Sequence, residues 1–289
     1  PNQNSDMLSA DYNFPSNTTP ANVQLFPAAY YLDVDGDAKK DLLVSPNANN
    51  VSENENSVWF YKNLSSNQGP VFAFQENDWL QGDMIEHGAG SRPVLADLNQ
   101  DGLLDLLVGN FHAYKPVLNK ESRIAYYQNI GTASAPSFVL VDNNFLDLAN
   151  AGLGLNFMPS VGDLNNDGKP ELIIGRDDGH LAYFLNTTSG TTPSFSLQTS
   201  TLSDATGNAI QVPMFASPQL FDLNEDGKLD LIIGYKGGGL IYFENTGTLT
   251  TAAFTQQSTA LGAVNVAVNG PDGFSNACFF KWQDSTYLL

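Results

Sequence analysis

The sequence predicts an all-β protein, because a unit of about four short strands recurs along it at a nearly constant pitch. Three parts follow one another in each unit: an acidic loop, an aromatic segment ending in Asn, and a Phe-centred segment behind a turn of small residues. The acidic loops begin at Asp33, Asp97, Asp163 and Asp222, at spacings of 64, 66 and 59 residues. Four antiparallel strands in each unit of about 60 residues are typical of a β-propeller blade.

The first two strands of each unit flank the acidic loop. The segments that lead into the loops, and so predict the first strand, are 92–96, 158–162 and 217–221. The apolar runs behind the loops, such as 104–108 and 229–233, are rich in Leu, Ile and Val and end at Gly. Runs this short predict strands buried on both faces, and no stretch keeps a 3.6-residue period over three turns.

The third and fourth strands follow in the same order in every unit. The aromatic segments that predict the third strand are 58–63, 124–129, 181–186 and 240–245. The Phe-centred segments that predict the fourth strand are 71–74, 137–140, 194–197 and 252–255. A β-sandwich would not repeat its loop chemistry at a fixed pitch, so the repeat favours a propeller.

The repeat also predicts the domain organisation. Four full units are expected near 23–80, 90–145, 156–200 and 215–257, with a partial fifth at 275–289. The fifth lacks its acidic loop, because Lys281 stands where the first Asp belongs. Residues 1–22 are expected to be the end of a preceding blade or a strand that closes the ring. Since an unfinished blade exposes strand edges, we expect this chain to be part of a longer one.

Composition limits the partners. The chain has 31 acidic and 12 basic residues, a formal charge of −19, which disfavours nucleic acid and anionic lipid and favours a cation. A single Cys278 and three His exclude a disulfide framework and a thiolate or multi-histidine metal cluster. No apolar run approaches the ~20 residues of a membrane span, so membrane insertion is not expected.

The acidic loops predict metal sites. The pattern Asp-x-Asp/Asn-x-Asp-Gly-x-x-Asp/Glu offers side-chain oxygens at positions 1, 3, 5 and 9 and a backbone carbonyl at position 7. An oxygen-only set with loose geometry suits Ca²⁺. The predicted ligands, for up to four ions, are Asp33, Asp35, Asp37, Lys39 and Asp41; Asp97, Asn99, Asp101, Leu103 and Asp105; Asp163, Asn165, Asp167, Lys169 and Glu171; and Asp222, Asn224, Asp226, Lys228 and Asp230.

Two points qualify the metal prediction. In the first loop Gly36 stands at position 4 and Ala38 at position 6, where the other loops have Gly, which makes this the weakest predicted site. Single Asp/Asn/Gly loops also serve as plain hairpin turns, and only the four loops in register favour calcium over that alternative. The loops are not EF-hands, because the closing carboxylate stands at position 9 and no helices flank them.

The repeated core 222–234 with the segment 242–248 behind it resembles the FG-GAP/VCBS repeat family. That family is similar to the propeller of integrin α subunits and is common in bacterial surface and secreted proteins. The resemblance covers roughly residues 23–289 and implies calcium loops and a ring of seven blades. Seven such units exceed 289 residues, which again indicates a longer chain.

The expected function is a calcium-stabilised extracellular module for adhesion or ligand binding, in a secreted or cell-surface bacterial protein. A protein or glycan ligand is expected on the face opposite the acidic loops, where the long loops 45–57 and 110–123 lie; the second holds Phe111, His112, Tyr114 and Lys115. Insertions without a role are the alternative for these loops.

Two other functions stay open. The first alternative is a non-catalytic, glycan-binding accessory domain of a secreted polysaccharide-active enzyme. A propeller enzyme with an axial site is the second. Catalysis is not expected, because the sequence holds no nucleophile elbow, zinc-protease motif or phosphate loop. His180, beside Asp177 and Asp178, is expected in a surface turn.

Overall fold

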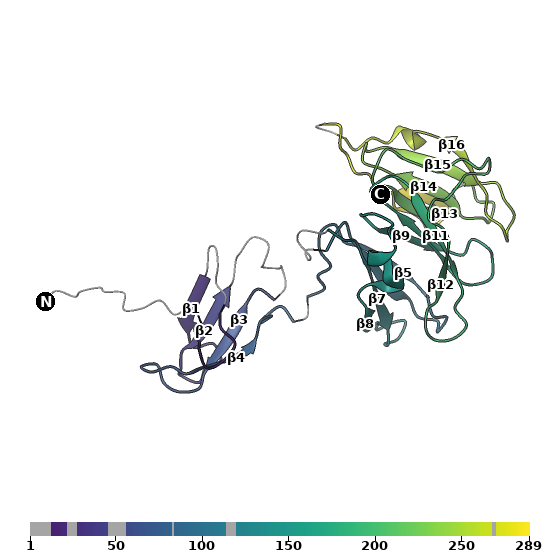
Figure 1. Ribbon diagram of the computed structural model, residues 1–289. Coiled ribbons are helices and arrows are strands. Elements are labelled where there is room, and N and C mark those ends of the chain that lie inside the picture. The colour runs from purple at the N-terminus through teal and green to yellow at the C-terminus, as the bar shows by residue number, and fades with distance from the viewer. Residues whose placement is uncertain (1–12, 22–27, 46–55, 83, 114–119, 268–269) are drawn as a thin grey trace. The chain divides into compact units, whose positions relative to one another are not determined.

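The computed structural model describes residues 13–21, 28–45, 56–82, 84–113, 120–267 and 270–289 (Figure 1). The chain divides into two compact units, Pro1–Glu86 and His87–Leu289. Every sheet is antiparallel, with strands of four to six residues. The prediction of an all-β protein built from four-stranded repeats is therefore confirmed. No helix among the described residues is long and apolar enough to cross a membrane.

The first unit holds one four-stranded sheet. Its strands pair in chain order and are β1 (Ala28–Leu32), β2 (Asp41–Ser45), β3 (Trp59–Asn63) and β4 (Phe72–Glu76). Val44, Tyr61 and Phe72 form its small core. The described part of the N-terminal segment lies against β4, where the Asn17 side chain donates to the Phe72 carbonyl at 2.8 Å. The role predicted for residues 1–22 stays a prediction, since residues 1–12 and 22 lie outside the described residues.

The second unit holds three further sheets and a hairpin. Its second-blade strands are β5 (Arg92–Ala96), β6 (Asp105–Gly109), β7 (Ile124–Asn129) and β8 (Phe138–Asp142). Its third-blade strands are β9 (Met158–Gly162), β10 (Glu171–Gly175), β11 (Leu181–Asn186) and β12 (Phe195–Thr199). Its fourth-blade strands are β13 (Ser217–Phe221), β14 (Asp230–Gly234), β15 (Leu240–Asn245) and β16 (Phe254–Ser258), and the hairpin is β17 (Phe279–Trp282) with β18 (Ser285–Leu288).

The first strands of successive blades are neighbours in space. β9 lies beside both β5 and β13, although each belongs to a different sheet, and β13 lies beside β17. The apolar cores fill the spaces between the sheets, with one cluster joining the second and third blades and another joining the third and fourth. This arrangement is that of consecutive propeller blades.

Glycines at the ends of the second strands permit this close packing. A Cβ atom on Gly109, Gly175 or Gly234 would lie 2.2, 2.1 or 2.2 Å from a backbone carbonyl oxygen of the next blade's entry segment. The residues that carry these oxygens also donate backbone hydrogen bonds back across the junction; Ala216, for example, donates to Arg176 at 2.9 Å. The Gly that ends each apolar run is therefore a packing requirement between blades.

The predicted strands agree closely with the structure. The first strands of blades two to four and the third strands β7, β11 and β15 have the predicted bounds, while the second and fourth strands begin one or two residues later than predicted. The β17–β18 hairpin confirms the partial fifth repeat, with a tight turn in place of the acidic loop. The sequence did not predict two 3-10 helices, η1 (Phe145–Asn150) and η2 (Leu261–Ala263).

Candidate metal-binding loops

All four acidic loops have the same backbone conformation. The residue at position 4 is left-handed in each, with φ of 78° at Gly36, 62° at Gln100, 58° at Asn166 and 63° at Glu225. The residue at position 6 is left-handed too, as Gly102, Gly168 and Gly227, and as Ala38 with φ of 67° in the first loop. The displaced Gly of the first loop therefore leaves the backbone conformation of the loop unchanged. That displacement was the reason to expect the weakest metal site in this loop.

The aspartates at positions 1 and 5 hold this conformation. The position 1 carboxylate accepts the backbone N–H of position 6; the pairs are Asp33 with Ala38 (2.9 Å), Asp97 with Gly102 (2.9 Å), Asp163 with Gly168 (2.9 Å) and Asp222 with Gly227 (3.0 Å). The position 5 carboxylate accepts the N–H of position 7; the pairs are Asp37 with Lys39, Asp101 with Leu103, Asp167 with Lys169 and Asp226 with Lys228, at 2.9 to 3.0 Å. Each aspartate keeps further lone pairs for a cation.

The acid at position 9 is fully buried in every loop. The four residues, each with 0% exposure, are Asp41, Asp105, Glu171 and Asp230. Their carboxylates accept backbone N–H groups at the end of the third strand, as Asp230 does from Asn245 at 2.8 Å. Burial raises the pKa of Asp105 above its usual range and raises the pKa of Glu171 to about 7. These acids tie the loop to the third strand.

The first loop brings three carboxylates together. Oxygen atoms of Asp33, Asp35 and Asp37 all lie within 4.8 Å of one another. The Lys62 ammonium contacts the Asp35 carboxylate and lies 3.5 Å from that of Asp37. Its hydrogen bond to Asp35 lowers the pKa of that carboxyl and raises the pKa of the Lys62 amine. The cluster thus attracts positive charge, and its oxygen-only donors fit a hard divalent cation.

The other three loops have a neutral residue at position 3. The side-chain oxygens of Asn99, Asn165 and Asn224 accept the position 5 N–H at 3.0, 2.9 and 3.1 Å. Each of these loops therefore offers one carboxylate fewer near the turn than the first loop. Their donors are still carboxylate and amide oxygens alone, the set that calcium accepts. Nothing in the geometry tests the predicted carbonyl ligands at position 7.

The Asn that ends each aromatic segment has a role that the sequence pattern did not predict. The four residues, Asn63, Asn129, Asn186 and Asn245, are at most 3% exposed. Asn129 is representative: its amide donates to the Leu104 carbonyl at 3.2 Å, and its oxygen accepts N–H groups of Gly131 and Ser137 at 3.0 Å each. These amides organise the turn into the fourth strand. Their recurrence at the same place in all four repeats was the signal that could have revealed this role.

An aromatic row lies at the blade ends opposite the acidic loops. Phe111 follows β6, Phe215 precedes β13 and Phe274 precedes β17, and consecutive rings are 5.6 and 5.3 Å apart between centroids. Phe215 and Phe274 hold left-handed backbone, with φ of 56° and 49°. The row thus includes Phe111 of the predicted ligand face, together with the neighbouring His112, whereas Tyr114 and Lys115 lie outside the described residues.

His180 lies in the turn between β10 and β11, as predicted. Its Nδ1 atom is 3.2 Å from the Asp178 carboxylate, which also pairs with the buried Arg176 at 3.1 Å. The Asp177 carboxylate accepts the backbone N–H of Leu155 at 3.0 Å. Asp177 and Asp178 thus both have structural partners.

Comparison with known proteins gives two findings. Residues 33–108 match the family model described as an FG-GAP-like repeat, and the match begins at Asp33 and takes in the first two acidic loops. Integrin alpha-4 of Xenopus laevis is 30% identical over 152 residues, which make up 50% of this chain and 14% of that integrin. The similarity therefore spans a small part of the integrin's length.

Proposed function

Residues 33–108 match an FG-GAP-like repeat, and on that premise we propose that the chain is a calcium-stabilised, non-catalytic binding module that acts outside the cell. The observation that carries the proposal is the convergence of Asp33, Asp35 and Asp37 in a loop whose backbone recurs three times. Three carboxylates this close repel one another, and a divalent cation relieves that repulsion more fully than the single charge of Lys62.

Calcium would stabilise the blades through their hairpins. Each acidic loop joins the first and second strands of a sheet, and its position 9 acid is bonded to the third strand. An ion held at positions 1, 3 and 5 would therefore fix three of the four strands. Extracellular modules bind calcium with Kd of order 10⁻⁴ to 10⁻³ M, which suits the concentration outside cells. This match supports the extracellular, secreted or surface location that we propose.

The aromatic row supports a binding role on the opposite face. Phe274 is 49% exposed, and Met214, the residue before Phe215, is 48% exposed, so the row is open to a partner. Phe215 and Phe274 keep left-handed backbone, which costs a bulky residue roughly 1–3 kcal/mol and is a reason to suspect function. We assign this row as the contact for a protein partner of the module.

A melting experiment tests the calcium role. The protein is heated in 2 mM CaCl₂, in excess EGTA, and in MgCl₂. At 2 mM calcium and a Kd of 10⁻⁴ to 10⁻³ M, each site adds about 0.6 to 1.8 kcal/mol, so four sites together should give a calcium-specific rise in Tm of at least about 5 °C. An equal Tm in calcium and EGTA would mean that the loops are only hydrogen-bonded turns.

Two pairs of substitutions distinguish calcium binding in the loops from a general effect of the protein's negative charge. Asp101→Asn with Asp167→Asn keeps an oxygen acceptor at position 5 and removes two charges, so it should halve the calcium-induced rise and change the Tm in EGTA little. The control is Glu76→Gln with Asp284→Asn, which removes two exposed charges outside the loops. If both pairs lower the calcium response equally, a specific site in the loops is refuted.

The second candidate function is a glycan-binding accessory domain of a secreted polysaccharide-active enzyme. One observation favours it: an uncharged pocket lies between the third and fourth blades, lined by hydroxyl, amide and aromatic side chains. Such a lining suits a neutral, hydroxyl-rich ligand. Binding of a polysaccharide without its cleavage would support this candidate.

A further inference from the structure

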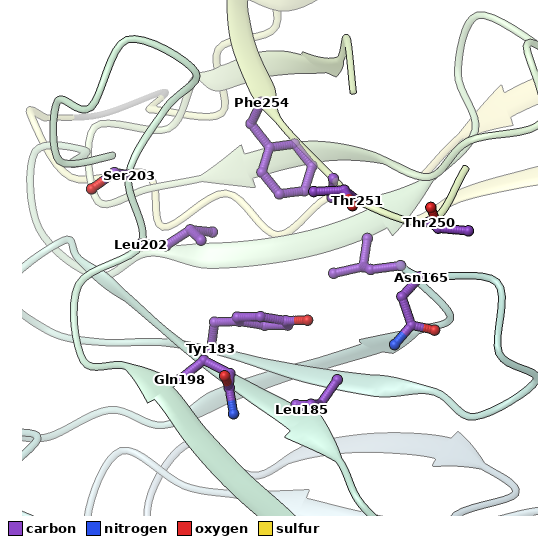
Figure 2. Close-up of a pocket in the computed structure, with 11 residues that line it drawn as sticks. Asn165, Tyr183, Leu185, Gln198, Leu202, Ser203, Thr250, Thr251 and Phe254 are labelled. Carbon is purple, nitrogen blue, oxygen red and sulfur yellow. The ribbon is translucent and has the colours of Figure 1, made fainter. Parts of the chain in front are cut away.

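A pocket of about 310 Å³ opens between the third and fourth blades (Figure 2). Its walls come from the third acidic loop, strands β11 and β12, the segment after β12, the turn before β16 and the first residue of β16. In Figure 2, Tyr183 and Phe254 lie on opposite sides of the space, with Leu202 and Asn165 toward its two ends. The volume is at the lower end of the roughly 300–1,000 Å³ found for ligand pockets, enough for one ring-sized group.

The pocket lies beside a repeated position that carries a smaller side chain here than in the two preceding repeats. The position lies 21 residues after the start of each aromatic segment and is Trp79, Phe145 and Leu202 in the first three repeats. The strand register makes Phe145 and Leu202 equivalent: Tyr126 pairs with Asp142 and Tyr183 with Thr199, and each of the two residues stands three positions after that partner. The side chain at this position therefore decides how much space remains beside the aromatic segment.

In the preceding junction the same space is filled. Phe145 is 5% exposed, and its ring centroid lies 5.2 Å from that of Tyr126 and 5.9 Å from that of Phe195. These two rings correspond to Tyr183 and Phe254 one blade later. In the next junction Leu202 stands where Phe145 stands here, and the rings of Tyr183 and Phe254 face an open space. The opening is therefore a difference between otherwise equivalent junctions.

Tyr183 has a free hydroxyl, unlike its counterparts. Tyr126 donates to Asp105 at 3.2 Å and Tyr242 donates to Asp230 at 2.9 Å, whereas no described residue hydrogen-bonds the Tyr183 hydroxyl. Burial, reinforced by nearby acids, raises the pKa of Tyr183 to about 12. The hydroxyl therefore stays protonated and can donate a hydrogen bond to a ligand.

The other polar groups around the pocket are neutral. No charged side chain is among the described residues that line it, although the chain has a formal charge of −19. The hydroxyls of Ser203 and Thr251 and the amide oxygen of Gln198 have no hydrogen-bond partner within the described part of the chain. A ligand here meets donors and acceptors without a charge, between apolar walls.

We propose that this pocket binds one neutral sugar ring of a glycan. The ring's C–H groups would lie on the negative π-face of Tyr183, and its hydroxyls would bond the Tyr183 hydroxyl and the amide and hydroxyl groups around it. This inference rests on the second candidate function, glycan binding, and names its ligand class.

The test is a binding measurement on the full chain in calcium. The probes are an array of neutral and acidic oligosaccharides, followed by NMR titration with the methyl glycosides of glucose, galactose, mannose and N-acetylglucosamine. Leu202→Phe copies Phe145 and should close the pocket, abolishing binding at an unchanged or higher Tm. Tyr183→Phe removes only the hydroxyl and should weaken binding about tenfold, again without loss of Tm.

The control is Tyr242→Phe, which removes the corresponding hydroxyl of the next blade. It should lower the Tm, because it breaks the bond to Asp230, and it should leave sugar binding intact. Absence of any neutral-sugar binding, binding limited to acidic sugars, or binding that survives Leu202→Phe would each overturn the inference. These outcomes are independent of the calcium melt, so the binding module proposed above can stand or fall separately.

Discussion

The Asp230 carboxylate accepts the Tyr242 hydroxyl at 2.9 Å while its other oxygen accepts the backbone N–H of Asn245 at 2.8 Å. The same carboxylate also accepts the N–H of Leu223 at 3.1 Å. One fully buried acid thus joins the loop, the second strand and the third strand of its blade. The position 9 acid, predicted only as a metal ligand, is an internal connector of the blade as well.

Asp230→Asn tests this connecting role. The amide has one acceptor oxygen in place of two and turns an N–H₂ group toward backbone donors, so at least one buried N–H loses its partner. We expect a loss of about 2–4 kcal/mol in the free energy of unfolding, measured by urea denaturation in EGTA. Asp284→Asn, at an exposed position, is the control and should change it by less than about 0.5 kcal/mol.

Measuring in EGTA separates the role of Asp230 in joining the strands from its role as a metal ligand. If Asp230→Asn lowered stability only when calcium was present, the acid would act solely through the ion. An equal loss with and without calcium would mean that the backbone contacts account for the whole effect.

Ala38→Gly should stabilise the first unit. Ala38 holds φ of 67° at a position where the other three loops have Gly, and the residue is exposed, so packing offsets little of the strain. An L-residue in this region costs roughly 1–2 kcal/mol, against roughly 0.5–1 kcal/mol for the extra chain freedom of Gly. A gain of about 0.5–1 kcal/mol is expected in urea unfolding of the first unit; any loss would contradict the assigned loop conformation.

The strands and loops could be read from the sequence because they repeat. Segments such as 158–162 and 181–186 gave strand bounds that β9 and β11 match, since four copies of one pattern average out local ambiguity. Helix η1 could not be predicted in this way. It lies in the linker between blades, where the copies differ, and it contains left-handed residues at Leu146 and Asp147.

The sequence predicted which residues form the acidic loops, but it predicted their conformation less well. The pattern located every loop, yet the expected weakness of the first loop rested on the place of one Gly, and Gly36 at position 4 satisfies the same backbone. The pocket beside Tyr183 could not be predicted, because it depends on Leu202 failing to fill a space that another repeat fills. Asn63 and Asn186, each the first residue of an Asn-x-Ser/Thr sequence, are buried structural amides.

Gly175→Ala should be among the most damaging single changes in the second unit. The new Cβ atom would lie 2.1 Å from the Ala216 carbonyl oxygen and 2.6 Å from the Pro218 ring, so the third and fourth blades would have to separate. We expect a loss of at least about 3 kcal/mol in unfolding experiments. Gly190→Ala is the matched control, because no atom lies within 4 Å of its Cβ and its φ is not positive. Similar stability of both variants would refute the close approach between these blades.

Glu171 should make the stability of the metal-free protein depend on pH in an unusual direction. Burial raises its folded-state pKa to about 7, against a usual value of 4.5. Between these values the folded state binds more protons than the unfolded state, so the free energy of unfolding falls as pH rises through that window. The slope for one such group is at most about 1.4 kcal/mol per pH unit. Glu171→Gln stays neutral at every pH and removes this contribution.

The measurement is urea unfolding of both proteins in EGTA at several values between pH 4.5 and pH 7.5. The other carboxylates titrate alike in the two proteins, so the difference between their curves isolates Glu171. We expect the wild-type protein to lose stability relative to Glu171→Gln as pH rises, and to regain it when calcium is added at pH 7.5, because the ion favours the ionised carboxylate that Gln lacks. Parallel curves in EGTA would show that Glu171 ionises normally despite its burial. A calcium response equal in both proteins would show that this carboxylate is not a ligand.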